Sequence, residues 1–217
     1  MLVVSNPSAD QPSGTLSVSP VAQDPLKRAL DILVAGGALL FFAPLLLLVA
    51  VLIKLETPGP VLFRQTRGGL NGNPFTIYKF RSMRCQENGA RVVQARRDDD
   101  RITPIGRVLR KTSIDELPQL LNVLRGDMSL VGPRPHALAH DEQYGAIIAN
   151  YRLRFRARPG LTGLAQIRGL RGGTSALEAM AARVEADNAY IEQWTLGGDV
   201  KILLLTLPHL LLAENAY

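Results

Sequence analysis

Two adjacent carboxylates, Asp115 and Glu116, are the side chains whose types and position best suit chemistry in this sequence. They stand at the start of a predicted helix, because leucines recur at helical spacing at positions 117, 120, 121 and 124 and Gly126 then supplies a stop. Backbone N–H groups and the helix dipole favour negative charge at such a position. Taken alone, the two acids fit a well-capped amphipathic helix better than a catalytic site, so their surroundings have to distinguish the two.

The first residue of this helix has two interpretations. Ser113 and Glu116 have the spacing of a capping box, which places Asp115 at the second helical position. Pro118 favours a later start with Asp115 itself as the cap, since proline is tolerated only in the first turn. In both cases Asp115 lies where the helix start favours an anion.

Charge is distributed unevenly along the 217 residues, which contain 25 Lys and Arg against 19 Asp and Glu. Residues 54–111 hold 13 basic and 5 acidic side chains, and residues 152–171 hold six arginines and no acid. Such tracts indicate anionic partners, either phosphates or anionic lipid headgroups. Nucleic acid fits less well, because aromatic residues are sparse and no nucleic-acid-binding motif is present. The single Cys85 and the spacing of the three histidines exclude a thiolate cluster and a zinc motif.

Residues 29–53 form an apolar run of 25 residues whose only charge is Asp31, longer than the roughly 20 residues that span a bilayer as a helix. Pro44 lies near its middle, where it bends or breaks a helix. Both flanks are basic, and the positive-inside rule places each of them in the cytoplasm. We therefore expect a re-entrant membrane helix hairpin over residues 25–57, broken at Pro44. A single spanning anchor with a proline kink is the alternative, and the polar residues 1–24 are expected to form a disordered tail.

Residues 58–217 are predicted to form a globular α/β domain, mostly helical with a small irregular sheet. Short strands are expected at residues 61–63, 75–78 and 165–167. Further helices are expected at residues 141–155 and 174–194. The apolar residues 200–213 are too short to span a membrane and should lie at its interface or pack on the domain. The aspartates 98–100 are interpreted as a solvated loop.

A turn around Arg134 suits phosphate binding. Pro133 and Pro135 fix the backbone on either side of its guanidinium, which can then bind a phosphate through two hydrogen bonds. The alternative is a rigid turn with a solvent-facing arginine.

Several motifs in fixed order resemble those of the bacterial sugar transferase family, the monotopic phosphoglycosyl transferases that start cell-surface glycan assembly. The matching segments are Lys27-Arg28 with Asp31, Phe42-Ala43-Pro44, residues 78–83, residues 110–117, residues 125–135, residues 158–163 and residues 199–202. The resemblance covers residues 26–217. This chain departs from the family at the predicted helix break, where Ala43 replaces a frequent serine before Pro44, and at Leu164, which replaces a common tryptophan.

The resemblance implies that a sugar-1-phosphate moves from a UDP-sugar to undecaprenyl phosphate, with release of UMP. Asp115 corresponds to the nucleophile, which forms a covalent phosphosugar intermediate, and Glu116 to its partner; both are the expected Mg²⁺ ligands. A carboxylate can attack phosphorus only when the diphosphate charge is neutralised, which Mg²⁺ and arginines provide. The residues that correspond to family positions for phosphate and substrate binding are Lys79, Arg81, Arg110, Arg134, Arg158 and Gln166. Asp199 matches a recurring acid whose role the sequence does not reveal.

The resemblance also implies a monotopic protein on the cytoplasmic face of the bacterial inner membrane that catalyses the first membrane step of exopolysaccharide synthesis. UDP-glucose is the favoured donor, with UDP-galactose as the alternative. Membrane lipids are expected partners and nucleic acid is not; a homodimer and downstream glycosyltransferases are left open. The competing interpretations are an inactive membrane-attached scaffold on the same fold and a glycosyltransferase that moves the sugar without its phosphate.

Overall fold

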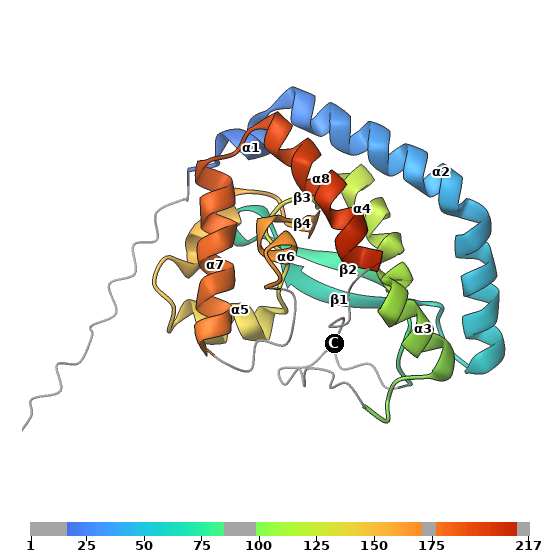
Figure 1. The fold of residues 1–217 in the computed structure, drawn as a ribbon. Coiled ribbons are helices and arrows are strands. Elements are labelled where there is room, and N and C mark those ends of the chain that lie inside the picture. The colour runs from blue at the N-terminus through green and yellow to red at the C-terminus, as the bar shows by residue number, and fades with distance from the viewer. Residues whose placement is uncertain (1–16, 85–98, 171–176, 212–217) are drawn as a thin grey trace, which may run out of the picture.

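The protein folds as a set of helices around two small two-stranded sheets, as seen in a computed structural model that describes residues 17–84, 99–170 and 177–211 (Figure 1). The α-helices are α1 (Pro20–Gln23), α2 (Pro25–Glu56), α3 (Pro104–Thr112), α4 (Leu120–Arg125), α5 (Leu138–Gly145), α6 (Leu164–Ile167), α7 (Leu177–Glu192) and α8 (Leu196–Leu211). The 3-10 helices are η1 (Leu70–Gly72), η2 (Ile114–Gln119) and η3 (Tyr151–Arg156). The strands are β1 (Leu62–Gly68), β2 (Pro74–Phe80), β3 (Ser129–Val131) and β4 (Gly160–Thr162). The predicted class, mostly helical α/β, is confirmed.

The long apolar run forms one continuous helix, α2. Its cap is Asp24, whose carboxylate accepts a hydrogen bond from Lys27 N at 2.8 Å. Pro44 lies inside the helix without interrupting it, yet α2 turns partway along, so that its two parts run in different directions (Figure 1). The predicted break is therefore a bend, because proline removes one hydrogen bond while the neighbouring turns continue. Among the described helices, only α2 is long and apolar enough to cross a membrane, judged by length and composition alone.

Both ends of α2 are tied to the globular part of the protein. Near its start, the buried Asp31 accepts a hydrogen bond from Leu130 N of β3 at 3.0 Å. At its end, the carboxylate of Glu56 accepts from Ile105 N of α3 at 2.9 Å. Between these ties, five large apolar side chains of α2 are at least 70 % exposed: Leu33, Leu40, Phe41, Leu47 and Leu55. The bend lets a helix of this length leave the domain and return to it.

The two strand pairs differ in direction. β1 and β2 form an antiparallel hairpin whose register runs from Leu62 opposite Phe80 to Gly68 opposite Pro74, so both predicted strands exist and are longer than expected. β3 and β4 are parallel. The two segments approach so closely that a Cβ on Gly160 would lie 2.1 Å from the backbone nitrogen of Gly132, just after β3. Only glycine fits at this position.

Asn122 of α4 joins the edge of β2 and so holds the candidate site in place. Its Oδ1 accepts from Tyr78 N at 3.1 Å, and its Nδ2 donates to Thr76 O at 2.7 Å. The side chain is completely buried, so the lost hydration of its amide is replaced by these bonds. Because η2 directly precedes α4, this contact holds η2 against β2.

The segment after Ser113 starts in neither of the two ways that the sequence allowed. The segment begins as the 3-10 helix η2, which contains Pro118, and becomes α-helical only at α4. Ser113 adopts a left-handed conformation with φ of 57° and makes no side-chain capping bond, while Glu116 N donates to its carbonyl oxygen at 3.1 Å. Neither the capping box nor an Asp115 cap is formed. The helix does end as predicted, at Gly126 with φ of 90°.

Three other local predictions need correction. Residues 165–167 belong to the short helix α6 and not to a strand. The helix predicted over 141–155 is divided into α5 and η3, with residues 146–150 between them. Residues 20–23 form α1, whose Val21 and Ala22 are buried, so the disordered tail is wrong there.

Other predictions agree with the structure where they are covered. The long helix predicted near residues 174–194 is confirmed as α7, and Met180, Val184 and Ile191 of its expected apolar stripe are buried. Of the aspartates interpreted as a solvated loop, Asp100 is exposed, whereas the side chain of Asp99 is mostly buried and forms an ion pair with Arg101 at 2.7 Å. Parts of four predictions lie outside the described residues: positions 1–16 of the tail, Asp98 of the aspartate run, positions 174–176 of the long helix, and positions 212–213 of the apolar C-terminal segment.

Candidate active site

Asp115 is a buried carboxylate that accepts no hydrogen bond from a described residue. It lies in η2, which packs against β2 and α3, and only 7 % of its surface is exposed. Burial raises the pKa of Asp115 to about 6; the neighbouring Glu116 adds to this rise, whereas Lys79, Arg110 and Arg134 oppose it. Within the described part of the chain, no group donates a hydrogen bond to its oxygens. At neutral pH the carboxylate is mainly ionised, and its oxygens are available to a ligand.

Glu116, the next residue, is by contrast held by three hydrogen bonds from two cations. Its Oε1 accepts from Lys79 Nζ at 2.8 Å and from Arg134 Nη2 at 2.6 Å, and its Oε2 accepts from Arg134 Nη1 at 3.2 Å. Burial alone would raise the pKa of Glu116, but Arg134 and Lys79 outweigh it and hold the pKa well below the usual value. The glutamate thus draws β2, η2 and the turn after β3 together, with a bidentate arginine as its main partner.

Two further arginines add positive charge around these carboxylates. Arg110, in the last turn of α3, lowers the pKa of Asp115. Arg67 of β1 was not selected from the sequence, yet burial first and then Arg134 lower its pKa to about 10. The Nε of each is buried and has no hydrogen-bond partner among the described residues. Buried N–H groups without partners are costly, so their presence in a cationic cluster indicates a place for anionic oxygens.

Asp115 and Glu116 could supply some, but not all, of the ligands of a bound Mg²⁺ ion. Within residues 17–84, 99–170 and 177–211, no three His, Cys, Asp or Glu side chains gather as a metal site. Mg²⁺, however, is commonly held by one or two carboxylates together with substrate phosphates. The free oxygens of Asp115 and the remaining lone pair of Glu116 fit that pattern, because three hydrogen bonds use three of about four lone pairs on Glu116.

Arg154 and Arg67 hold the Pro-Arg-Pro turn by its backbone. Arg154 donates from Nη2 to the carbonyl oxygen of Arg134, and Arg67 donates from Nη1 to that of Pro135 at 3.1 Å. Arg154 is itself fixed by an ion pair with Asp187 of α7 at 2.8 Å, with both side chains almost fully buried. The turn predicted at Arg134 is therefore present, and its half-buried guanidinium binds Glu116.

His136 belongs to the same buried network. Its Nδ1 lies 2.6 Å from Arg154 Nη1 and 2.7 Å from Tyr151 Oη. Because an arginine can only donate, Nδ1 accepts and the ring proton is assigned to Nε2. Burial first, and then the surrounding arginines, hold the pKa of His136 well below its usual value, so the ring is neutral. It serves the network as an acceptor.

Three residues expected in the substrate site lie elsewhere or remain without a partner. Arg81 donates to Thr57 O at 2.7 Å and to Pro58 O at 2.6 Å, which ties its guanidinium to the end of α2. Arg158 donates to carbonyl oxygens at Gly126 and near α1, apart from Glu116. Gln166 is buried beside the turn that leads to Arg134, and neither polar atom of its amide has a partner among the described residues.

Asp199, to which the sequence assigned no role, accepts three hydrogen bonds that hold helices together. It is completely buried; its Oδ2 accepts from Lys27 Nζ at 2.8 Å and from Trp194 Nε1 at 3.0 Å, and its Oδ1 accepts from Tyr190 Oη at 2.9 Å. These bonds join α2, α7 and α8. No simple spacing links Asp199 to Lys27, so the sequence had no signal for this contact.

Comparison with known proteins places the whole site within a matched region. The family model described as bacterial sugar transferase matches residues 22–213. A UDP-glucose:undecaprenyl-phosphate glucose-1-phosphate transferase of Caulobacter vibrioides is 63 % identical over 197 residues, which is 91 % of this chain and 74 % of that protein. The protein of the same name from Escherichia coli is 53 % identical over 84 % of this chain and 39 % of its own length.

A relative with another printed substrate is also similar. A UDP-N-acetylgalactosamine-undecaprenyl-phosphate N-acetylgalactosaminephosphotransferase of Aeromonas hydrophila is 44 % identical over 94 % of this chain and 47 % of its own length. The chain thus spans less than half of some relatives and three quarters of another.

Proposed function

Because this chain belongs to the bacterial sugar transferase family, we propose that it transfers glucose-1-phosphate from UDP-glucose to undecaprenyl phosphate. The observation that carries the proposal is the contrast between two neighbouring acids. The carboxylate of Asp115 is buried, ionised at neutral pH and free of hydrogen bonds from described residues, whereas Glu116 accepts three hydrogen bonds from Lys79 and Arg134. Of the two acids, Asp115 is the one whose oxygens accept no hydrogen bond from described residues, which leaves its lone pairs available for nucleophilic attack.

In the first step, an oxygen of Asp115 attacks the β-phosphorus of UDP-glucose. The P–O bond to the bridging oxygen breaks, UMP leaves with the electron pair, and a glucose-1-phosphate group remains on the carboxylate. Negative charge accumulates on the phosphoryl oxygens and on UMP. Lys79, Arg110 and Arg134 are the cations suited to stabilise this charge, because they already surround Asp115.

In the second step, a phosphate oxygen of undecaprenyl phosphate attacks the same phosphorus. The bond to Asp115 breaks, the carboxylate is restored, and the lipid-linked diphosphate sugar is released. Bound Mg²⁺, held by Asp115 and Glu116 together with the diphosphate, would supply further charge neutralisation. Glu116 orients Lys79 and Arg134 through both steps.

The geometry of α2 supports a re-entrant placement on the cytoplasmic face of the inner membrane. A straight helix of 32 residues would be about 48 Å long. Both ends nevertheless bond to the same domain, through Asp31 and Glu56, and the exposed apolar side chains lie between those ties. An arch of this kind enters and leaves one leaflet, which keeps Asp115 near the depth of a polyprenyl phosphate headgroup. A homodimer and downstream glycosyltransferases remain expectations on which these contacts have no bearing.

The test is incubation of the membrane-bound protein with undecaprenyl phosphate and a panel of UDP-sugars, with the released nucleotide identified. UMP release with UDP-glucose is expected. UDP release would contradict the proposal in favour of a plain glycosyltransferase, and no release would favour the scaffold. UMP release only with UDP-galactose or UDP-N-acetylgalactosamine would keep the reaction and change the sugar. Mass spectrometry of enzyme incubated with UDP-glucose alone should find the phosphosugar on Asp115.

A further inference from the structure

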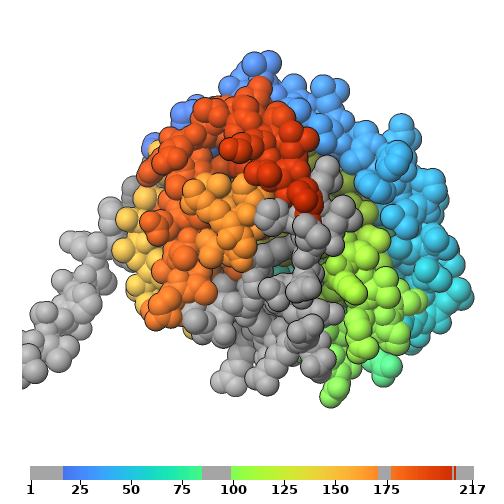
Figure 2. All heavy atoms as spheres, viewed as in Figure 1, coloured from blue at the N-terminus to red at the C-terminus, as the bar shows by residue number. Residues whose placement is uncertain are grey.

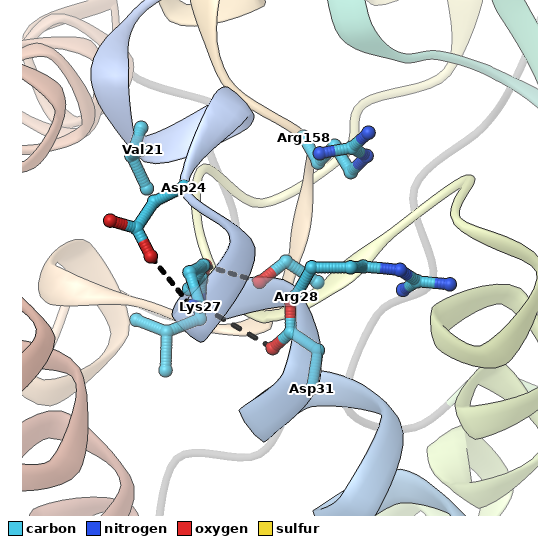
Figure 3. Close-up of a pocket in the computed structure, with 8 residues that line it drawn as sticks. Val21, Asp24, Lys27, Arg28, Asp31 and Arg158 are labelled. Carbon is cyan, nitrogen blue, oxygen red and sulfur yellow. Dashed lines mark hydrogen bonds and ion pairs between the residues drawn. The ribbon is translucent and has the colours of Figure 1, made fainter.

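A pair of arginines near the start of α2 forms a second cationic site, separate from the Asp115 cluster (Figure 3). Arg28 donates from Nη1 and Nη2 to two carbonyl oxygens in the last turn of α4, at 2.6 and 2.9 Å. Arg158 donates from Nε to Gly126 O, just beyond α4, at 3.0 Å. Both guanidinium groups therefore meet at the C-terminal end of one helix, where free carbonyls attract cations.

The two arginines have no acidic partner. All their hydrogen bonds within the described residues go to backbone carbonyls. Burial lowers the pKa of Arg158, and the neighbouring Arg28 lowers it further, which places the two like charges close together. Two acids line the same pocket, but each already accepts hydrogen bonds: Asp24 accepts from Lys27 N, and Asp31 Oδ1 accepts from Leu130 N and from Lys27 Nζ. Two adjacent positive charges that form no ion pair among the described residues are a site for an external anion, although Asp31 partly offsets the charge of Arg158.

The surroundings identify the kind of anion. In Figure 3 the side chains of Arg28 and Arg158 extend to the same side, away from the Lys27–Asp31 pair. The apolar surface of α2 begins in the same turns, with Leu26 66 % exposed and Leu33 73 % exposed. Cations bordering an apolar helix match the boundary between lipid tails and phosphate headgroups.

We propose that Arg28 and Arg158 bind the phosphate of an anionic phospholipid headgroup at the membrane surface that α2 enters. This inference rests on the membrane placement proposed above. It gives the enzyme a lipid contact distinct from its substrates, since the main charges that act on Asp115 come from Lys79, Glu116, Arg110 and Arg134 and not from this pair. A phosphate there would offset the repulsion between the two guanidinium groups. It would thereby stabilise their hydrogen bonds to the carbonyl oxygens at the end of α4. Because α4 follows η2 directly, the same contact stabilises the segment that carries Asp115.

The experiment compares the full chain in nanodiscs of phosphatidylcholine alone and of phosphatidylcholine with phosphatidylglycerol. UMP release is measured in both, and native mass spectrometry counts the phosphatidylglycerol retained by the released protein. The wild type should retain phosphatidylglycerol and be several-fold more active in its presence. The double variant Arg28→Gln/Arg158→Gln should lose both the retained lipid and the stimulation. The matched control Arg107→Gln/Lys201→Gln removes two exposed cations from α3 and α8 and should keep both.

Several outcomes would overturn the inference. A wild type that retains no phosphatidylglycerol, or is not stimulated by it, refutes the lipid site without reference to any variant. A double variant that keeps lipid and stimulation refutes the residue assignment. If phosphatidylglycerol stays bound to that variant while the KM for undecaprenyl phosphate or UDP-glucose rises, the pair belongs to a substrate site. A wild type that does not float with vesicles at all contradicts the proposed membrane placement instead, which separates the two failures.

Discussion

Arg154 donates a hydrogen bond to the backbone carbonyl of Arg134, the residue whose guanidinium donates two hydrogen bonds to Glu116. One buried arginine thereby positions another that lies 20 residues away in the chain. Asp187 of α7 fixes Arg154 in turn. The cluster around Asp115 is thus supported by α7 through a chain of charged groups.

We predict that Arg154→Lys reduces turnover without abolishing it. Lysine keeps the charge opposite Asp187 but lacks the planar guanidinium whose Nη2 donates to both Asp187 and the carbonyl of Arg134. Displacement of Arg134 removes a charge that lowers the pKa of Asp115, so the acid limb of the activity profile should move to higher pH. We expect kcat per active site, counted from trapped phosphosugar, to fall by about 10–100-fold.

A merely structural role for Arg154 would give a different pattern. The number of active sites would then fall, while kcat per site and the acid limb stayed unchanged. Arg152→Lys, a neighbouring exposed position, serves as the control and should leave the profile as it is.

Asp115→Asn should separate activity from stability. Loss of the nucleophile should lower UMP release by at least about 10³-fold. The same change removes a buried charge that the fold disfavours, since burial raises the pKa of Asp115. The melting temperature at pH 7 should therefore rise by a few degrees, measured by differential scanning fluorimetry. An inactive variant with a lowered melting temperature would contradict this account of the carboxylate.

Glu116→Gln should have the opposite effect on stability. It leaves Lys79 and Arg134 without their shared anion in a mainly buried cluster, where loss of one partner of an ion pair costs about 3 kcal/mol. Chemical denaturation at pH 7 measures this loss, and Glu142→Gln on an exposed part of α5 is the control. Equal stability of Glu116→Gln and wild type would show that the pair is not coupled to folding.

The pH dependence should reflect Asp115. Nucleophilic attack requires the ionised carboxylate, so kcat/KM should fall as the pH drops through about 6. For stability the sign is reversed: the folded state holds the proton more tightly than the unfolded chain, whose pKa is near 3.8, so this group adds stability as pH falls from about 6 towards 4. An acid limb near pH 4 would contradict the burial-raised pKa.

Cysteine labelling on both sides of α2 tests the arch. Single cysteines at Gln23 and Lys54, both exposed, should react with a reagent confined to the cytoplasm and resist one confined to the periplasm. The native Cys85 is first replaced by serine. Periplasmic labelling at Gln23 alone would restore a single spanning anchor.

The sequence by itself determined the elements whose signals are local. Leucine spacing predicted the helix after Asp115, the apolar run predicted α2, and ordered motifs identified the family. Local signals failed where several conformations are close in energy. Pro118 was compatible with two helix starts, and the packing of η2 against β2 selected a 3-10 turn that neither start anticipated.

Tertiary structure alone decided which charged groups meet. Arg81 and Lys79 lie two residues apart at the end of one strand, yet Arg81 binds the end of α2 and Lys79 binds Glu116. Arg67 and Arg154 carry no motif that marks them, although they hold the turn that presents Arg134. The physical reason is that an ion pair depends on distance in the folded chain and on shared burial, neither of which residue type or spacing encodes. Asp115 owes its raised pKa and its unpaired oxygens to that same burial, so its chemistry arises only when the surrounding segments have packed.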